Sequence, residues 1–511
     1  MLRYARVALG GLLILALGLA GFAGPGVQKQ RGGVIRVAEL APGGPIGTPW
    51  SMPVFGVLAA MPVYETLVWV DAWNRAHPRL AERWEVTPDR KGLILRLRRG
   101  VRFHDGTPME AAAVKFSLDE SLKARRLPTY IESVEALDAH TVRLNLSRWD
   151  NGIFLALSGS GAFIVSPSNV RRLGPERAQW QPVGTGSFRI TRYDPSAHAD
   201  YVRFAQYWDP PKPYLDRIEI RFFPTEQPLV LQAALLAGQL DIARIRERHI
   251  LDQLRQTGRF EIVAGLPSRS VLMLIPDSAN ADSPFADPRV REAVSYALNR
   301  EALARALEGG APEPWNQIAV PGSPAVLNDY RGPTYNPSRA KELLAQAGYP
   351  NGFSTRLIPA WYLDRDVGVA LQQALAQVGI RAELELPQIG RYVEYQRKGW
   401  RGLLVHRFGY FPNFNSYVGF YLGDTAAEVW ASVKRPEALQ KLLEESAGTL
   451  TPQRHKLQLL HRLLLQDHTV IPVYTHPGTQ VVIRKGIHDT GHLQGATWPW
   501  WRPADAWMER R

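Results

Sequence analysis

The first clear pattern of hydrophobic and polar positions lies in residues 80–115, where it predicts two strands, two turns and a helix. Leucine occupies positions 93, 95 and 97 while arginine occupies 96 and 98, so one face of a strand there is apolar. A second β-rich run spans Trp84 to Val86, and Pro88, Asp89 and Gly92 between the two runs are turn residues. We therefore expect a hairpin.

The helix that follows this hairpin has the sequence of a capping box. Thr107 precedes Pro108, and Glu110 stands three positions after the threonine. In such a box the threonine side chain accepts from a free N–H of the first turn, and the glutamate reaches back to the cap. We expect the helix to begin at Thr107, directly after a tight turn at Asp105 and Gly106.

Other strands are expected where apolar residues alternate or run together. Residues 34–40, 218–223 and 380–386 alternate, as strands buried on one face do. Val271–Ile275 is apolar throughout, which is typical of a strand buried on both faces. Residues 470–474 predict a further strand near the C-terminus.

Helix signals separate these strands in the second half of the chain. Asp287, Asn336 and Thr451 each precede a proline, so each is expected to cap a helix whose first residue is that proline. A helix over residues 367–378 should end at Gly379. Helices that alternate with strands predict α/β layers.

Length and composition limit the class of protein. A chain of 511 residues exceeds one ordinary core, so we expect two or more domains. Its 45% hydrophobic and 21% charged residues are those of a globular protein. The chain has no cysteine, which excludes disulfides, thiolate metal sites, cysteine nucleophiles and a lipid attached to cysteine.

The N-terminus has the layout of a secretory signal peptide. Two arginines precede an apolar run from Val7 to Ala23, and small residues surround its end. We expect residues 1–23 to be removed, which leaves a soluble periplasmic protein that is not a lipoprotein. An uncleaved membrane anchor is the alternative, because the run is only slightly shorter than a spanning helix.

The formal net charge of +13 does not point to nucleic acid, because no basic block dominates the sequence. Four arginines of the predicted hairpin, at positions 96, 98, 99 and 102, are expected to form a solvated face. Attraction of the whole chain to acidic ligands or to membrane headgroups stays open.

Catalytic and metal motifs are weak. Ser158–Gly161 and Gly184–Ser187 come near a nucleophile elbow, but neither has the G-x-S-x-G spacing. His455, His461 and His468 lie on a predicted helix whose leucines already form a core stripe, so packing and surface roles suffice. We predict no enzymatic activity, no catalytic residue, no cofactor and no metal site.

One long signature carries a family resemblance. The run from Leu80 through Trp84 to Pro108, which includes RRGVRFHDGTP, resembles the signature region of the family 5 extracellular solute-binding proteins. These are the peptide- and nickel-binding proteins of ABC importers. PVGTG at 182–186, FADPRVREA at 285–293 and NPSRAKELL at 336–344 are similar to further segments of that family, in the same order.

The resemblance implies an α/β fold of the two-lobed periplasmic binding protein type, with mixed sheets and a small insertion domain on the first lobe. Two chain segments cross between the lobes, and ligand closes them by a hinge motion. The implied domains are residues 33–62, 182–266 and 472–511 for lobe I, 63–181 for the insertion domain and 267–471 for lobe II.

Candidate ligand-binding residues follow from strand ends and from the resemblance. Open α/β sheets hold ligands beyond their strand ends, and the family holds its ligand on strand ends that face the other lobe. The candidates come from the loop after the first strand, from the start of lobe II and from two strand ends of lobe II: Trp50, Ser51, Arg269, Trp361, His406, Arg407, Phe408 and Tyr410.

One of these positions departs from the family. Peptide-binding relatives carry an acidic residue about four positions before the equivalent of Pro412, where it pairs with the α-amino group of the peptide. Here that position is Phe408, with Arg407 beside it, and no Asp or Glu occurs between Glu394 and Asp424. We expect poor binding of free peptides, unless Glu39, Glu65 or Asp364 supplies the carboxylate.

The resemblance therefore predicts a periplasmic protein that captures a small solute, peptide-like or otherwise polar, and delivers it to an inner-membrane ABC permease. We expect a monomer that binds no nucleic acid. A periplasmic chaperone or peptide-sequestering protein, a nickel or metallophore binder and an oligosaccharide binder stay open as alternatives.

Overall fold

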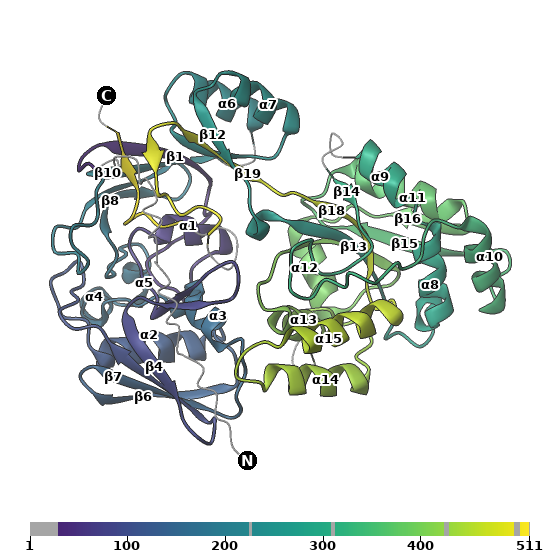
Figure 1. The fold of residues 1–511 in the computed structure, drawn as a ribbon, viewed down its shortest axis with the longest axis horizontal. Coiled ribbons are helices and arrows are strands. Elements are labelled where there is room, and N and C mark those ends of the chain that lie inside the picture. Colours follow the sequence, from purple (N-terminus) through teal and green to yellow (C-terminus); the bar gives the residue numbers. More distant parts are fainter. Residues whose placement is uncertain (1–28, 224–226, 308–311, 424–428, 495–500, 510–511) are drawn as a thin grey trace, which may run out of the picture.

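The computed structural model describes residues 29–223, 227–307, 312–423, 429–494 and 501–509. The expected signal peptide, residues 1–23, lies outside this described part of the chain. Within the described part, every helix is too short or too polar to span a membrane. Figure 1 shows two α/β lobes side by side, which confirms the two-lobed α/β fold with mixed sheets.

The first lobe is built on a seven-stranded mixed sheet. Its central strand is parallel to both neighbours, and the strand from the chain's C-terminal part lies antiparallel between two others. The order is β12 (Phe260–Val263), β19 (Gln480–Arg484), β11 (Ile242–Ile245), β1 (Val34–Leu40), β10 (Arg217–Phe223), β9 (His198–Arg203) and β8 (Phe188–Asp194).

Short helices and a small two-stranded antiparallel sheet complete this lobe. Two helices pack against the β11–β12 end of the sheet, at the top of Figure 1. The elements are η1 (Val54–Gly56), α1 (Val57–Ala60), α6 (Pro228–Leu236), α7 (Arg248–Gln256), β20 (Ile487–His488) and β21 (Trp507–Met508). We call this body lobe I.

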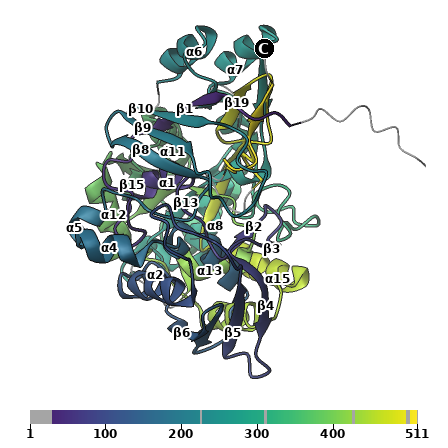
Figure 2. The ribbon, with the colours of Figure 1, turned by 90° about the vertical axis from the view of Figure 1, so that its left-hand side faces the viewer.

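The insertion domain has its own core and an antiparallel four-stranded sheet, seen in Figure 2. Its hairpin β4–β5 confirms the strands predicted from the leucine pattern. The sheet order is β4 (Ala81–Val86), β5 (Gly92–Leu97), β7 (Thr141–Leu146) and β6 (Ile131–Asp138). The other elements are β2 (Val68–Val70), β3 (Ala76–Pro78), α2 (Ala111–Lys123), α3 (Ile153–Ser158), η2 (Ser160–Ala162), α4 (Pro167–Leu173) and α5 (Pro175–Ala178).

The predicted capping box of this domain is wrong. Helix α2 begins at Ala111, and its N-cap Glu110 makes no side-chain cap bond. The Asp105 side chain accepts from both the backbone N–H of Thr107, at 3.0 Å, and the Thr107 hydroxyl, at 2.6 Å. The chain then stays extended, because Met109 N–H bonds Val101 O at 2.9 Å. The threonine therefore completes a turn and caps no helix.

The second lobe is built on a six-stranded mixed sheet, and we call it lobe II. All residues of its central strand β13 are buried, which confirms the strand predicted at Val271–Ile275. The order is β14 (Glu313–Pro314), β18 (Ile471–His476), β13 (Ser270–Pro276), β17 (Leu403–Gly409), β15 (Phe353–Pro359) and β16 (Ile380–Leu384). The helices are η4 (Pro284–Ala286), α8 (Pro288–Ala297), α9 (Arg300–Ala306), α10 (Pro337–Gln346), α11 (Arg365–Ala376), α12 (Ile389–Lys398), α13 (Phe414–Leu422), α14 (Glu437–Ala447) and α15 (Arg454–Gln466).

Two of the three helix caps predicted in lobe II are confirmed. The Asp287 side chain accepts from the N–H of Arg289, and Asn336 accepts from Arg339, each with proline at the first helical position. The cap predicted at Thr451 is wrong, because α15 begins at Arg454 and follows Gln453.

Two chain segments cross side by side between the lobes (Figure 1). One carries η3 (Leu266–Ser268) from β12 to β13, and the other runs from β18 to β19. The Ser268 hydroxyl donates to the Pro477 carbonyl at 2.9 Å. Gly478 has φ +78°, and a Cβ there would lie 1.6 Å from the Ser268 carbonyl oxygen. Only glycine fits so close an approach.

Candidate functional site

The candidate site of lobe II lies at the sheet edge nearest the crossing segments. Strands β15 and β17 run parallel, and β13 starts beside the end of β17, where Ser270 pairs with Gly409. The Tyr410 N–H donates to the Arg269 carbonyl at 3.0 Å. Three segments distant in sequence therefore bring Arg269, Tyr410 and the loop after Pro359 to one edge of the lobe.

An aromatic cluster occupies this edge. Trp361 is 40% exposed, and its ring centroid lies 5.0 Å from Tyr362 and 5.6 Å from Tyr392. The Tyr392 ring stacks on His406 at 5.8 Å. The cluster offers one open tryptophan face, with two hydroxyl groups and an imidazole beside it.

His406 is a neutral hydrogen-bonding group. Burial, with a smaller effect from the Arg407 charge, lowers the pKa of His406 to about 3. Its Nδ1 lies 2.9 Å from the Tyr392 hydroxyl and 3.3 Å from the Tyr362 hydroxyl. At neutral pH the imidazole carries no charge and its orientation is fixed by these two tyrosines.

Phe408 lies in the core of lobe II. It is 1% exposed, and its ring centroid lies 4.5 Å from Tyr421, 4.9 Å from Trp430 and 5.3 Å from Tyr417. Strand β17 alternates, so Phe408 and His406 share the face packed against α12 and α13 while Arg407 points the other way. This placement removes the Phe408 ring from the side chains that can contact a ligand in this conformation.

Two arginines carry the positive charge of the edge. Arg407 is half-buried, and its backbone N–H donates to the Tyr362 hydroxyl at 3.1 Å. Arg269 is also half-buried, and within the described residues its guanidinium makes no hydrogen bond or ion pair. A guanidinium in this state is a ready partner for a carboxylate.

Trp50 and Ser51 are not brought to this edge by any contact of the described residues. The Trp50 ring packs edge-on against Phe116 of α2, with centroids 6.0 Å apart. The Ser51 hydroxyl lies 2.5 Å from the Thr48 hydroxyl. Both residues make their contacts within lobe I and the insertion domain.

Most carboxylates that could replace the missing acid are already engaged. Glu39 forms an ion pair with Arg244. Glu65 accepts from Arg79, Thr185, Tyr207 and Trp208. Asp364 is the exception, since it is exposed at the start of α11 and its side chain makes no cap bond there.

The insertion domain touches lobe II through a buried asparagine. Asn151 is 4% exposed, and its Nδ2 donates to Ser446 O at 2.8 Å and Thr449 Oγ1 at 3.1 Å. Its Oδ1 accepts from Asn413 at 2.8 Å and Asn415 at 3.3 Å. We call these five residues the asparagine contact. It joins the segment before α3 of the insertion domain to α13, α14 and the residues after α14 in lobe II.

Tyr410 adds a second contact between the lobes. It is buried, and its hydroxyl donates to the Ala72 carbonyl of the insertion domain at 2.6 Å. The asparagine contact and Tyr410 together hold the lobes in a joined state, which places the aromatic cluster and both arginines next to the junction.

Sequence reasoning missed Tyr362, Tyr392 and Asn151. Tyr362 directly follows Trp361 and could have been chosen as part of the same strand end. Tyr392 and Asn151 offer no such signal, because their partners lie in other elements. No group of three or more histidines or acids that could hold a metal occurs among the described residues.

Comparisons with known proteins match this architecture. The model for bacterial extracellular solute-binding proteins, family 5 middle, matches residues 75–428. Glutathione-binding protein GsiB of Escherichia coli O1:K1 / APEC is 32% identical over 354 residues, 68% of each chain. The GsiB protein of E. coli strain K12 shows the same identity and coverage.

Solved structures share the fold. DppA from Helicobacter pylori, in complex with the peptide STSA, has a TM-score of 0.79 at 20% identity over 94% of this chain and 99% of its own. AgaA in complex with agropinic acid, from A. tumefacien R10, has a TM-score of 0.78 at 21% identity with the same coverage. MoaA in complex with mannopinic acid, from the same source, has a TM-score of 0.74 at 21% identity over 94% of this chain and all of its own.

Proposed function

Because the chain belongs to the family 5 extracellular solute-binding proteins, we propose that its ligand is a neutral or anionic polar solute and not a peptide held by its free α-amino group. The family supplies the coarser function: a substrate-binding protein that delivers its ligand to an ABC transporter. Family members are solute-binding proteins, not enzymes. We further propose that this chain binds and releases its ligand unchanged, as a monomer that partners a permease.

The charge at the edge of the lobe II sheet carries the proposal. Arg269 and Arg407 lie there, the family's acidic position is a buried phenylalanine, and His406 is neutral. An ammonium group buried between the lobes would need a paired anion, since an unpaired buried charge is very costly. A ligand carboxylate instead gains two-pronged hydrogen bonds from a guanidinium.

The relatives suggest which acids to test first. GsiB is named for glutathione, and two structural neighbours were solved with agropinic acid and mannopinic acid. An acid of this kind would place a carboxylate on Arg407 or Arg269 and an apolar or sugar-like part on the exposed face of Trp361. Its closure of the lobes requires that it bind the joined state more tightly than the separated state.

Calorimetric titration tests the proposal with matched ligands. Agropinic acid, glutathione, a free dipeptide and its N-acetylated form are compared on the same protein. We expect agropinic acid and the acetylated dipeptide, which have no ammonium group, to bind more tightly than the free dipeptide and glutathione, which each carry a free α-amino group. Arg407→Gln should weaken the acids by about tenfold or more, which is the effect of one charge-assisted hydrogen-bonded pair. Arg381→Gln, an exposed arginine on β16, is the control.

The Asp364→Asn variant tests whether Asp364 pairs with the α-amino group of a peptide ligand. If free peptides bind tightly, lose binding on acetylation and lose it again in the Asp364→Asn variant, then Asp364 is the amine anchor and the proposal is wrong. If peptide binding is weak in both the parent and this variant, no amine anchor exists at that position.

A further inference from the structure

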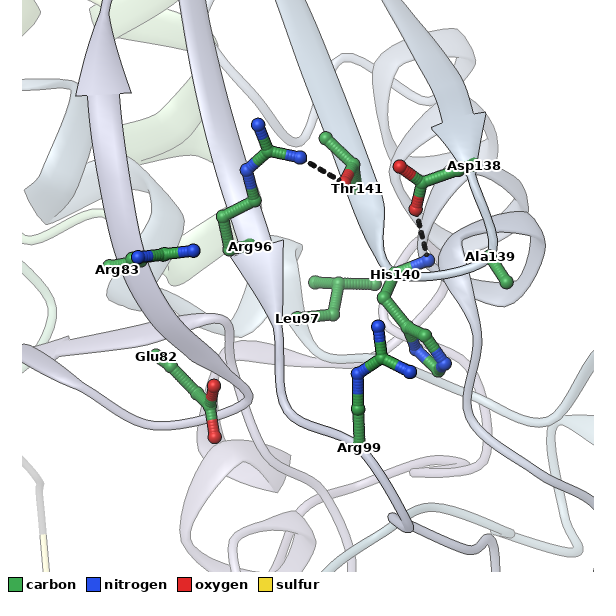
Figure 3. Close-up of a pocket in the computed structure, with 9 residues that line it drawn as sticks. All are labelled: Glu82, Arg83, Arg96, Leu97, Arg99, Asp138, Ala139, His140 and Thr141. Carbon is green, nitrogen blue, oxygen red and sulfur yellow. Dashed lines mark hydrogen bonds between the residues drawn. The ribbon is translucent and has the colours of Figure 1, made fainter.

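The outer face of the insertion-domain sheet holds a polar pocket of about 510 Å³, shown in Figure 3. In the strand register Arg83 of β4 stands opposite Arg96 of β5, and Arg96 stands opposite Thr141 of β7. These three residues form one row across three adjacent strands. Arg99 and His140 close the pocket at the end of that row (Figure 3).

This row places like charges where a sheet disfavours them. Residues directly opposite in an antiparallel pair have Cβ atoms about 5 Å apart, and like charges there are destabilising. Arg96 donates to the Thr141 hydroxyl at 2.6 Å. Within the described residues, Arg83 and Arg99 make no hydrogen bond or ion pair. Two guanidiniums therefore share a pocket with no counter-charge bound to them.

The two carboxylates of the pocket form no ion pair with Arg83 or Arg99 among the described residues. Glu82 lies at an irregularity in the β4–β5 register and its Oε1 accepts from Arg98 at 3.4 Å. Asp138 Oδ1 accepts from the backbone N–H of His140 at 2.7 Å. That bond, with help from the Thr141 hydroxyl, lowers the pKa of Asp138. Neither acid lies within ion-pair distance of Arg83 or Arg99.

His140 lines the pocket beside these arginines. Its Nδ1 is buried and has no hydrogen-bond partner among the described residues. Figure 3 shows the imidazole beside the Arg99 guanidinium.

We propose that this pocket is a binding site for a phosphate group. Arg83, Arg96 and Arg99 supply fork-shaped donors that match the oxygens of a tetrahedral oxyanion. The phosphate could be free inorganic phosphate or part of a lipid headgroup, since both present the same oxygens. The site lies on the insertion domain and is independent of the ligand proposed for the lobe junction.

Calorimetry with inorganic phosphate at constant ionic strength tests the free anion, and co-sedimentation with phosphatidylglycerol vesicles tests the lipid. The variant is Arg83→Gln with Arg96→Gln. Its control is Arg305→Gln with Arg397→Gln, two exposed arginines of lobe II that give the same change in net charge. Each removed arginine should weaken binding about tenfold, so the pocket variant should lose about 100-fold.

Saturable phosphate binding that the pocket variant loses and the control keeps supports a free-anion site. If the parent binds vesicles but not inorganic phosphate, and only the pocket variant loses vesicle binding, the phosphate belongs to a lipid headgroup. Equal loss in the two variants would show general electrostatic attraction, and no binding of either probe would also overturn the proposal. Should the double variant misfold by circular dichroism, Arg99→Gln replaces it, since Arg99 lies outside the strands.

Discussion

Replacement of Asn151 by alanine should separate the lobes. The Asn151 side chain makes four hydrogen bonds, all to lobe II and all in a buried contact. A neutral hydrogen bond contributes about 1 kcal/mol net, and the longest of these contributes less. When the lobes are apart, water can satisfy the same groups. We therefore expect Asn151→Ala to disfavour the joined state by about 3 kcal/mol, or about 140-fold.

Distance measurement between two spin labels reports the equilibrium between joined and separated lobes directly. The chain has no cysteine, so Glu132→Cys on the insertion domain and Lys441→Cys on lobe II give a unique pair of labels. The parent should show one short distance in the joined state, and Asn151→Ala should shift most of the population to a longer and broader one. Small-angle scattering should show a matching rise in the radius of gyration.

Asn145→Ala is the matched control. Its side chain donates to Ser133 and Glu135, both within the insertion domain, so the variant removes an asparagine without touching lobe II. The reasoning is refuted if Asn151→Ala and Asn145→Ala give the same label distances as the parent. Thermal unfolding of both variants must stay cooperative, which separates opening of the lobes from loss of the insertion domain.

Three further outcomes follow. Ligand should shift tryptophan emission in the parent and in Trp50→Phe but not in Trp361→Phe, because Trp361, and not Trp50, lies at the exposed edge of the lobe II sheet. A shift that survives Trp361→Phe would contradict this. Arg291→Ala should lower the free energy of unfolding in denaturant by about 3–5 kcal/mol, because its buried guanidinium donates to the carbonyls of Phe285, Ala286 and Asp467, which then lose their donor. A loss below about 1 kcal/mol would contradict this. Burial lowers the pKa of His104 and of His461 to about 4. Both histidines favour the neutral form when folded and titrate near ~6.5 when unfolded. Their stabilisation is therefore complete above pH ~6.5 and lost as pH falls toward 4, so an equal unfolding midpoint at pH 7 and pH 5 would argue against it.

Local sequence signals were reliable where the residues that decide the structure are neighbours. Asp287 and Asn336 cap helices because the N–H groups they accept from lie two or three residues ahead. Thr107 has an equally good local pattern, yet Met109 pairs with Val101 and keeps the chain extended. That pairing depends on how the hairpin folds back, and no spacing in the sequence encodes it.

The candidate site also contains residues that local sequence could place and residues that it could not. Trp361 could be placed from the strand that precedes it, because strand ends of open sheets are where ligands bind. The burial of Phe408 could not be predicted from the sequence, because it depends on Tyr421 of α13 and Trp430 of the segment after α13. Asn151 lies 262 residues from Asn413, and only the assembled lobes bring them together.

The position of β19 has a consequence for the order of folding. This strand, residues 480–484, lies between β11 and β12, so lobe I has a gap in its sheet until almost the whole chain is present. Lobe II needs only residues 270–476, which are continuous, to complete its sheet. Contacts that close long loops form slowly, because the loop entropy is lost before the contact is gained. Lobe II should therefore become protected from hydrogen exchange first during refolding, and a chain that ends before Gln480 should retain a folded lobe II beside an incomplete lobe I.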